Sequence, residues 1–298
     1  DANTAVAVIG AGSSIPAGTV GVSAPNSGTG EAATFIGAGV TIDPDDYGSF
    51  TSSAANDATA SIGSGVTIVV TNTDADTTAV GVYATSGQAA DDSAGDESVE
   101  ITIGTNLTVT VDDGAAGDAD GAAGVYGFAT GADGGVGIEI ANGLNIDLTG
   151  NGAVGVAGIA AGTGDVSITT GTGTIDVVGL DNTDGAGNFP GSAGIGAIST
   201  SGDILIQSAT SITVDNGTLD AAGIYGESAG AGSVTVVSSG QILSSDTGIG
   251  AEAVDGNVVV NSSAFISAFA GAGINAVNDG TGDTSVFSTA SITSVQSN

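Results

Sequence analysis

One short signature returns along most of the chain and restricts the possible folds more than any other feature. It reads small residue, Gly, Val or Ile, any residue, then Ala or Gly, and two fainter copies lie around Gly21 and Gly48. Successive clear copies are 43, 31, 39, 29, 25 and 25 residues apart. Self-similarity at such a period is typical of a solenoid. The anchor glycines of the clear copies are Gly81, Gly124, Gly155, Gly194, Gly223, Gly248 and Gly273.

Each repeat unit contains three short strand patterns, and the unit that begins at Gly223 is the clearest. Strands are expected at Gly223–Gly226, Ser233–Val237 and Gln241–Leu243 before Gly248 starts the next unit. Three strands in 25 residues fit one coil of a right-handed parallel β-helix, whose coils stack about 4.8 Å apart. We therefore predict an all-β solenoid of about nine coils. A β-sandwich is the main alternative, and it does not explain a signature that recurs in register.

The whole chain, 1–298, is expected to form one solenoid domain, with less regular coils over 1–78 and clear repeats over 79–294. Longer units arise from acidic, Gly-rich inserts such as Gly87–Ser98 and Asp112–Gly121, which we place at corners. A corner insert leaves the stacked strands undisturbed. Val, Ile and Ala are expected to face inward. The hydrophobic fraction of 41% argues against disorder, and Gly lacks the strict period of collagen.

The charge of the chain excludes several classes of partner. There are 33 Asp and Glu residues but no Lys, Arg or His, so the formal net charge is −33. Nucleic acids and anionic membrane surfaces are bound through basic side chains, so both are excluded. No apolar run is long enough to insert into a membrane as a helix. Cations are therefore the expected ionic partners. The absence of Cys excludes disulfides, and a start at Asp1 without Met is expected of a processed, secreted product.

The repeats also resemble a known family. The stretch 221–230 (AAGIYGESAG), followed by Gly232–Val236 and Ser239–Ile242, resembles the repeats of autotransporter passenger domains and related haemagglutinin-like secreted proteins. The resemblance covers residues 79–294. It implies a β-helix displayed at the cell surface and, as one function, adhesion. The chain departs from the family in showing no C-terminal translocator barrel and in its complete lack of basic residues.

Catalysis is not expected. A Ser–His–Asp arrangement needs a base that this chain does not contain, and the Gly-rich segments lack the Lys of a phosphate-binding loop. A carboxylate pair that hydrolyses a glycoside is the remaining enzymatic alternative. Tyr83, Tyr126 and Tyr225 recur at one place in their coils, and Tyr47 is the fourth tyrosine. We interpret the recurring position as structural, with a sugar-stacking ladder as the alternative.

Acidic clusters in the expected corners are candidate Ca²⁺ sites, because Ca²⁺ prefers several carboxylate and carbonyl oxygens. No cofactor is required by the sequence, and calcium is the one candidate. Solvated, mutually repelling corners are the alternative for every cluster. The principal candidates are Asp43, Asp45, Asp46, Asp91, Asp92, Asp96, Asp112, Asp113, Asp118 and Asp120, and further clusters occur at Asp74/Asp76, Glu97 and Asp181/Asp184.

The outward positions of the middle strand give a last indication. Aligned by sequence, they read Thr102, Glu139, Ser167, Leu205, Thr235, Val259 and Ser285, which is not the Thr ladder of an ice-binding solenoid. Apolar residues concentrate toward the C-terminus instead, and they predict either a subunit interface or an end cap. These residues are Leu205, Val237, Val259, Phe265, Phe269 and Phe287.

The leading hypothesis is an extracellular, non-catalytic structural protein whose copies associate into a surface filament or layer. Uncapped solenoid ends favour such pairing. The alternative is a monomeric adhesin that binds a host or cell-surface ligand.

Overall fold

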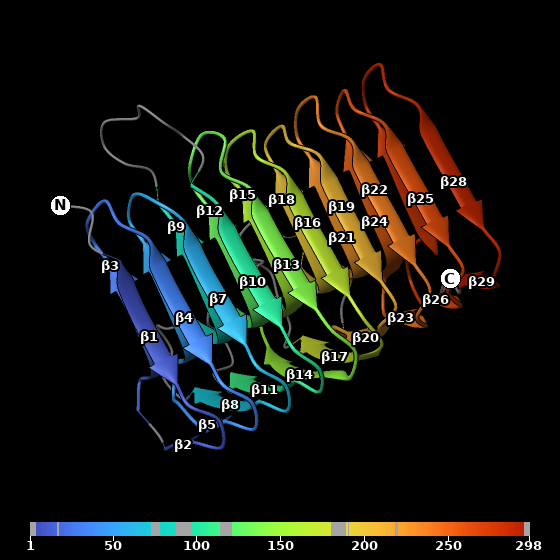
Figure 1. Cartoon of the computed structure of the whole chain (residues 1–298). Coiled ribbons are helices and arrows are strands. Elements are labelled where there is room, and N and C mark those ends of the chain that lie inside the picture. The colour runs from blue at the N-terminus through green and yellow to red at the C-terminus, as the bar shows by residue number, and fades with distance from the viewer. Residues whose placement is uncertain are drawn as a thin grey trace.

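A computed structural model shows a rod of stacked coils with the N- and C-termini at opposite ends (Figure 1). It describes residues 4–16, 18–72, 78–87, 97–113, 121–179, 189, 191–217 and 220–294. All regular structure in these residues is β-strand, and the strands form three parallel sheets. The structure confirms the predicted right-handed parallel β-helix.

Each coil contributes one strand to each sheet, in the order sheet A, sheet B, sheet C. Sheet A comprises β1 (Ala5–Ile9), β4 (Ala32–Ile36), β7 (Ala58–Ile62), β10 (Val99–Ile103), β13 (Val136–Ile140), β16 (Val166–Thr170), β19 (Ile204–Ser208), β22 (Val234–Ser238), β25 (Val258–Ser262) and β28 (Thr284–Ser288). Sheet B comprises β2 (Ser14–Ile15), β5 (Thr41–Ile42), β8 (Thr67–Asn72), β11 (Thr108–Asp113), β14 (Leu144–Gly150), β17 (Gly173–Gly179), β20 (Ser211–Asp215), β23 (Ile242–Ser244), β26 (Ile266–Ala268) and β29 (Ile292–Ser294). Sheet C comprises β3 (Val20–Asn26), β6 (Tyr47–Ser53), β9 (Ala79–Ser86), β12 (Ala122–Ala129), β15 (Val154–Ala160), β18 (Ser192–Ser199), β21 (Ala221–Ser228), β24 (Thr247–Ala253) and β27 (Ile274–Asn278).

The strands make nine complete coils, followed by β28 and β29 of a tenth. The predicted strands of the Gly223 unit correspond to β21, β22 and β23. The fainter anchors Gly21 and Gly48 lie in β3 and β6, which pair with each other, and β6 pairs with β9. The predicted inserts lie mostly outside the described residues, which omit 88–96 and 114–120. β9 ends at Ser86, before the first insert, whereas Asp112 and Asp113 of the second predicted insert belong to β11.

The core is a set of residue columns that run along the rod. Strand burial alternates, as in β10, where Val99, Ile101 and Ile103 are buried between exposed neighbours. One inward column of sheet B keeps a β-branched residue in every coil, so identical side chains stack at the strand spacing. Its members are Ile15, Ile42, Ile68, Val109, Ile146, Ile175, Ile212, Ile242, Ile266 and Ile292.

The inward columns are not entirely aliphatic, contrary to the sequence-based expectation. The last inward position of sheet A changes from Ile140 to Thr170 and then to Ser208, Ser238 and Ser262. Thr170 Oγ1 donates to Ser208 Oγ at 2.9 Å, and Ser238 Oγ donates to Ser262 Oγ at 2.8 Å. Buried hydroxyls are tolerated here because neighbouring coils supply their partners.

Candidate functional surfaces

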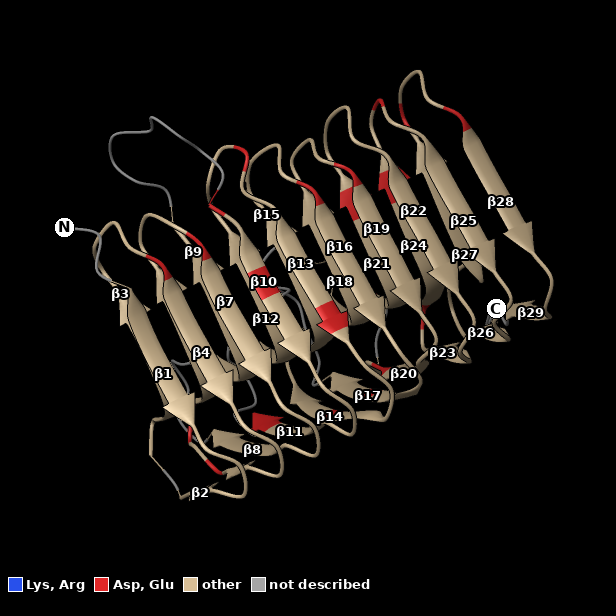
Figure 2. Cartoon of the chain, in the orientation of Figure 1, with Lys and Arg blue, Asp and Glu red and all other residues tan. Residues whose placement is uncertain are grey.

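Acidic residues recur along the corner where the chain leaves sheet C and enters sheet A (Figure 2). Polar side chains at this corner form a ladder of hydrogen bonds. Asp165 Oδ1 accepts the backbone N–H of Asp203 at 2.8 Å, and Asp203 Oδ1 accepts that of Ser233 at 2.7 Å. Ser233 Oγ accepts from Asn257 at 3.2 Å, and Asn257 Oδ1 accepts from Asp283 at 2.8 Å. We call Asp57, Ser98, Asp165, Asp203, Ser233, Asn257 and Asp283 the corner ladder.

The corner ladder gives part of the acidic composition a structural role. In the N-terminal half, Asp57 Oδ1 accepts the N–H of Ser98 at 2.8 Å. Ser98 Oγ then accepts the N–H of Gly135 at 3.4 Å, and the series is interrupted because Gly135 has no side chain. A carboxylate that accepts a backbone N–H is stabilised without a cation. These Asp residues therefore join successive coils.

The predicted calcium residues do not converge where the structure describes them. Asp43 and Asp45 are exposed before β6, whereas Asp46 is buried. Asp112 is exposed and Asp113 is buried at the end of β11. Within the described ranges, no three Asp, Glu, His or Cys side chains form a group that could hold a metal ion. The remaining candidates lie outside the described residues, namely Asp74, Asp76, Asp91, Asp92, Asp96, Asp118, Asp120, Asp181 and Asp184.

The predicted interface residues occupy two faces instead of one. Leu205, Val237, Val259 and Phe287 lie on the outer side of sheet A, in β19, β22, β25 and β28. Phe265 and Phe269 are exposed on the sheet B side, around β26. The sheet A residues belong to two adjacent columns, because Leu205 aligns with Val259 through Thr235, whereas Val237 aligns with Phe287 through Asn261.

The outward column read from the sequence was misaligned in its first two members. Thr102 pairs with Glu139, and Glu139 pairs with Thr169 instead of Ser167. Ser167 aligns with Gly137 in the neighbouring column. The register is fixed by the buried residues between these columns, which stack Ile101, Ile138 and Ile168.

Sheet B has the outward hydroxyl column that sheet A lacks. It includes Thr108, one of the two threonines noted in the sequence. The adjacent outward column contains Val69, Asp147 and Asp176, so the hydroxyls do not repeat in two dimensions as a surface matched to an ice lattice would require. The hydroxyl column comprises Ser14, Thr41, Thr67, Thr108, Thr174 and Ser211, and the amide of Asn145 interrupts it between Thr108 and Thr174.

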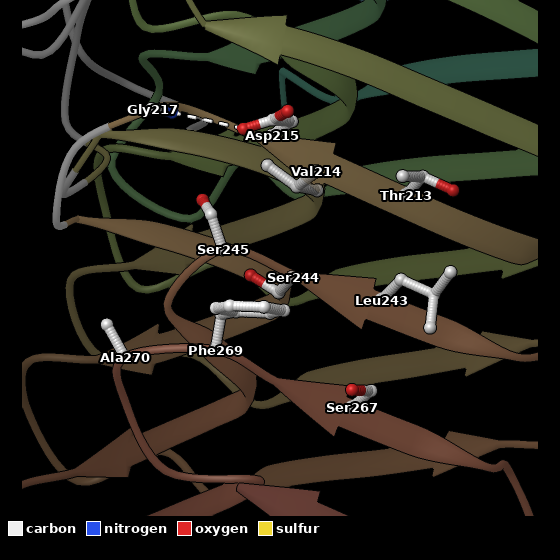
Figure 3. Close-up of a pocket in the computed structure, with 10 residues that line it drawn as sticks. All are labelled: Thr213, Val214, Asp215, Gly217, Leu243, Ser244, Ser245, Ser267, Phe269 and Ala270. Atoms are coloured by element: carbon white, nitrogen blue, oxygen red, sulfur yellow. Dashed lines mark hydrogen bonds between the residues drawn. The ribbon is translucent and has the colours of Figure 1, made fainter. Parts of the chain in front are cut away.

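An open groove of about 640 Å³ lies on the outer side of β20, β23 and β26 (Figure 3). Thr213, Leu243 and Ser267 lie next to one another in one outward column. Phe269, 65% exposed, lines the same groove, and Asp215 supplies its one carboxylate. The groove therefore offers an aromatic ring and several hydroxyls to a ligand.

Tyr83 and Tyr126, two of the three recurring tyrosines, form part of an aromatic stack on the outer face of sheet C. Phe50 stacks on Tyr83 and Tyr83 on Tyr126, with ring centroids 5.4 and 5.5 Å apart and planes within 9° and 11° of parallel. Burial raises the pKa of Tyr83 and of Tyr126. Because the rings use their faces on each other, this column supports the structural interpretation over a sugar-stacking ladder.

A second apolar cluster covers the middle of sheet C and was missed in the sequence. Phe189 lies against Gly196, where an added Cβ would collide with its ring. Small and β-branched residues of the cluster, such as Ala157 and Val154, let an aromatic ring pack flat on the sheet. The buried members of this cluster are Val154, Ala157, Ile159, Phe189, Ala193, Ala222 and Tyr225.

Acidic side chains meet beside Tyr225 on the same face. The Tyr225 hydroxyl donates to Glu227 at 2.7 Å, and Glu227 aligns with Glu252 on the next strand. Burial, together with the charges of Glu227 and Asp279, raises the pKa of Glu252. Burial is likewise the main cause of the raised pKa of Asp246. These carboxylates repel one another with no basic side chain nearby.

Comparison of the chain with protein-family models, curated proteins and solved structures finds no match. In the parts of the chain that the structure describes, no helix is long and apolar enough to cross a membrane. The fold and its surfaces define an acidic right-handed parallel β-helix.

Proposed function

We propose that the chain is a non-catalytic, extracellular structural protein whose copies associate into a surface filament or layer. The observation that carries this proposal is the distribution of exposed apolar side chains. Among the described residues, nine of the eleven large exposed apolar side chains lie in the first two and last two coils. Exposed apolar clusters of this kind mark association surfaces. They are Val6, Val8, Val20 and Phe35 at one end, and Phe265, Phe269, Val286, Phe287 and Ile292 at the other.

The chemistry of the chain supports a structural role outside the cell. With no His, Lys or Cys, the common general base and the most reactive nucleophiles are missing from the sequence. A chain without Lys or Arg also gives trypsin-like proteases no cleavage site. The repeat resemblance to autotransporter passengers favours the same location.

Electron microscopy by negative stain and sedimentation velocity test the proposal. The purified chain is expected to form filaments or sheets, and added salt or CaCl2 should promote them because cations screen the repulsion between subunits of charge −33. Short rods of one size, over a wide range of concentration and in all of these salts, would contradict self-association.

The groove of Figure 3 favours a second function, that of a monomeric adhesin. An exposed aromatic ring beside Thr213 and Ser267 is suited to a neutral ligand such as a cell-surface glycan, because the chain repels anionic ones. Binding to a glycan array should then be lost in Phe269→Ala and kept in Phe265→Ala, whose ring does not line the groove. Equal binding by both variants would remove the groove from consideration.

A further inference from the structure

Sheets A and B both end in strands that have a partner on only one side. Among the described residues, β1 and β2 are the first strands of these sheets, and β28 and β29 are the last. A strand with unpaired backbone N–H and C=O groups is a template for another strand. Within the described residues, the outer edges of β1, β2, β28 and β29 have no strand paired to them, and they offer the same parallel pairing that joins the coils.

The columns at the two ends continue one another. Ile292 ends the inward isoleucine column that Ile15 begins. On the outer face of sheet A, Phe287 ends the column that Val8 begins, and the two side chains are 60% and 68% exposed. A β28 edge placed on a β1 edge in register would bring Phe287 against Val8 and cover both.

Both ends also lack the charge that fills the rest of the chain. The sequence has 33 acidic residues, yet none lies in 2–30 and none in 284–298. Contact between like-charged molecules is opposed by repulsion at short range. Two copies of a chain of charge −33 can approach most closely where the approaching strands, β1 and β2 on one copy and β28 and β29 on the other, carry no acidic residue.

The corner ladder supplies a polar contact in the same geometry. Each ladder side chain before Asp283 accepts an N–H from the following coil, and Asp283 is the last member of the ladder. Thr4 occupies the equivalent position before β1, because Ala5 aligns with Ala32 and hence Thr4 with Glu31. In a stacked pair, the Asp283 carboxylate would accept the Thr4 N–H of the next copy.

We propose that copies of this chain stack head to tail, with β28 and β29 of one copy pairing in parallel with β1 and β2 of the next. This inference rests on the proposed self-association and specifies its geometry. Sheet C takes no part, because it ends one coil earlier at β27, and Pro25 in β3 has no N–H to donate. A contact between two different ends is heterologous, so it extends into a filament instead of closing as a dimer.

Two charge substitutions test the geometry, one at each end. Val8→Glu blocks the N-terminal end and Phe287→Glu blocks the C-terminal end, while both side chains point to solvent in the single chain. Each variant alone should be monomeric in sedimentation velocity, with association weakened about 30-fold or more, as expected on loss of a central apolar anchor. Val178→Glu, at an exposed valine in a middle coil, is the matched control and should assemble normally.

Mixing the two variants gives the decisive result. Each retains one intact end, so an equimolar mixture should form dimers and nothing larger. Dimers in either variant alone would show head-to-head or tail-to-tail contact and overturn the proposal. Unaltered filaments in both variants would show lateral assembly, which overturns this inference but leaves the proposed function standing. A parent chain that is monomeric in all conditions would overturn both.

Discussion

A Cβ atom added to Gly124 would lie 2.9 Å from Cγ2 of Ile146, the isoleucine of the sheet B column in the next coil. The same atom would lie 2.5 Å from the carbonyl oxygen of Gly155. The repeated Gly and the repeated Ile are therefore one structural feature, because the absence of a side chain at one position makes room for the methyl group at the other.

Gly124→Ala is expected to destabilise the chain by about 2–3 kcal/mol, because neither a backbone carbonyl nor a packed isoleucine can move away. Gly137→Ala is the control, since its Cβ would meet only one atom within van der Waals distance. Urea unfolding followed by circular dichroism measures both. Equal effects of the two substitutions would show that steric exclusion is not what selects glycine in the signature.

The corner ladder gives a prediction about a single carboxylate. Asp203→Ala should lower the free energy of unfolding by about 1 kcal/mol or more, because the Ser233 N–H loses its acceptor. Asp203→Asn keeps an acceptor and relieves repulsion from Asp165, so it should be at least as stable as the parent. The exposed Asp176, next to Asp147, provides the control, because Asp176→Ala removes a charge but none of the ladder bonds. If the Asn variant is as unstable as the Ala variant, hydrogen bonding is not the role of Asp203.

The sequence predicted the coil and its strands because the inward residues of short strands repeat at even spacing. It placed β22 within one residue at each end. Aligning the repeats by sequence failed for the outward columns, where Glu139 was aligned with Ser167 although it pairs with Thr169. Outward residues vary and corner lengths differ, so only the buried Ile138 and Ile168 reveal the register.

Three features of the structure were beyond the sequence for physical reasons. The hydrogen bonds of the corner ladder were not predicted, because nothing in the residue type shows that a carboxylate accepts an N–H 30 residues away. The buried Ser238–Ser262 hydrogen bond was not predicted, because a serine that faces the core has the same residue type as a serine in a loop. Phe189 lies in an insert without strand pattern, so its position over Gly196 depends on tertiary packing alone.

The carboxylates beside Tyr225 predict higher stability in acid. Burial first, and then the charges of Glu227 and Asp279, raises the pKa of Glu252 in the folded state. Folding therefore favours the protonated form of Glu252. The resulting stabilisation is fully present at a pH below 4.5, the ordinary pKa of the side chain, and it is lost as the pH rises through the raised pKa of the folded state. Glu252→Gln should accordingly raise Tm at about pH 7 and have little effect at about pH 4. A Tm increase of the same size at both pH values would contradict this assignment.

Calcium binding at the acidic corners is open to a direct measurement. If a site is specific, CaCl2 should raise Tm more than MgCl2 at the same concentration, because ligands that bind only the folded state stabilise it by mass action. A chelator should reverse the increase. If Ca²⁺ and Mg²⁺ act equally, the effect is ionic screening of the 33 carboxylates.

Phe189 covers part of the outer face of sheet C, so its removal tests whether the outer apolar cluster stabilises the fold. Phe189 is buried against Gly196 and the cluster that contains Val154 and Tyr225, so Phe189→Ala should cost about 3 kcal/mol and increase the binding of a hydrophobic dye. Phe269→Ala is the matched control, because that ring is largely exposed and its loss should leave the free energy of unfolding within about 0.5 kcal/mol of the parent. If the two substitutions change the free energy of unfolding equally, the Phe189 ring does not shield the outer face of sheet C from water. The cluster that contains Val154 and Tyr225 would then gain no stability from being covered by that ring.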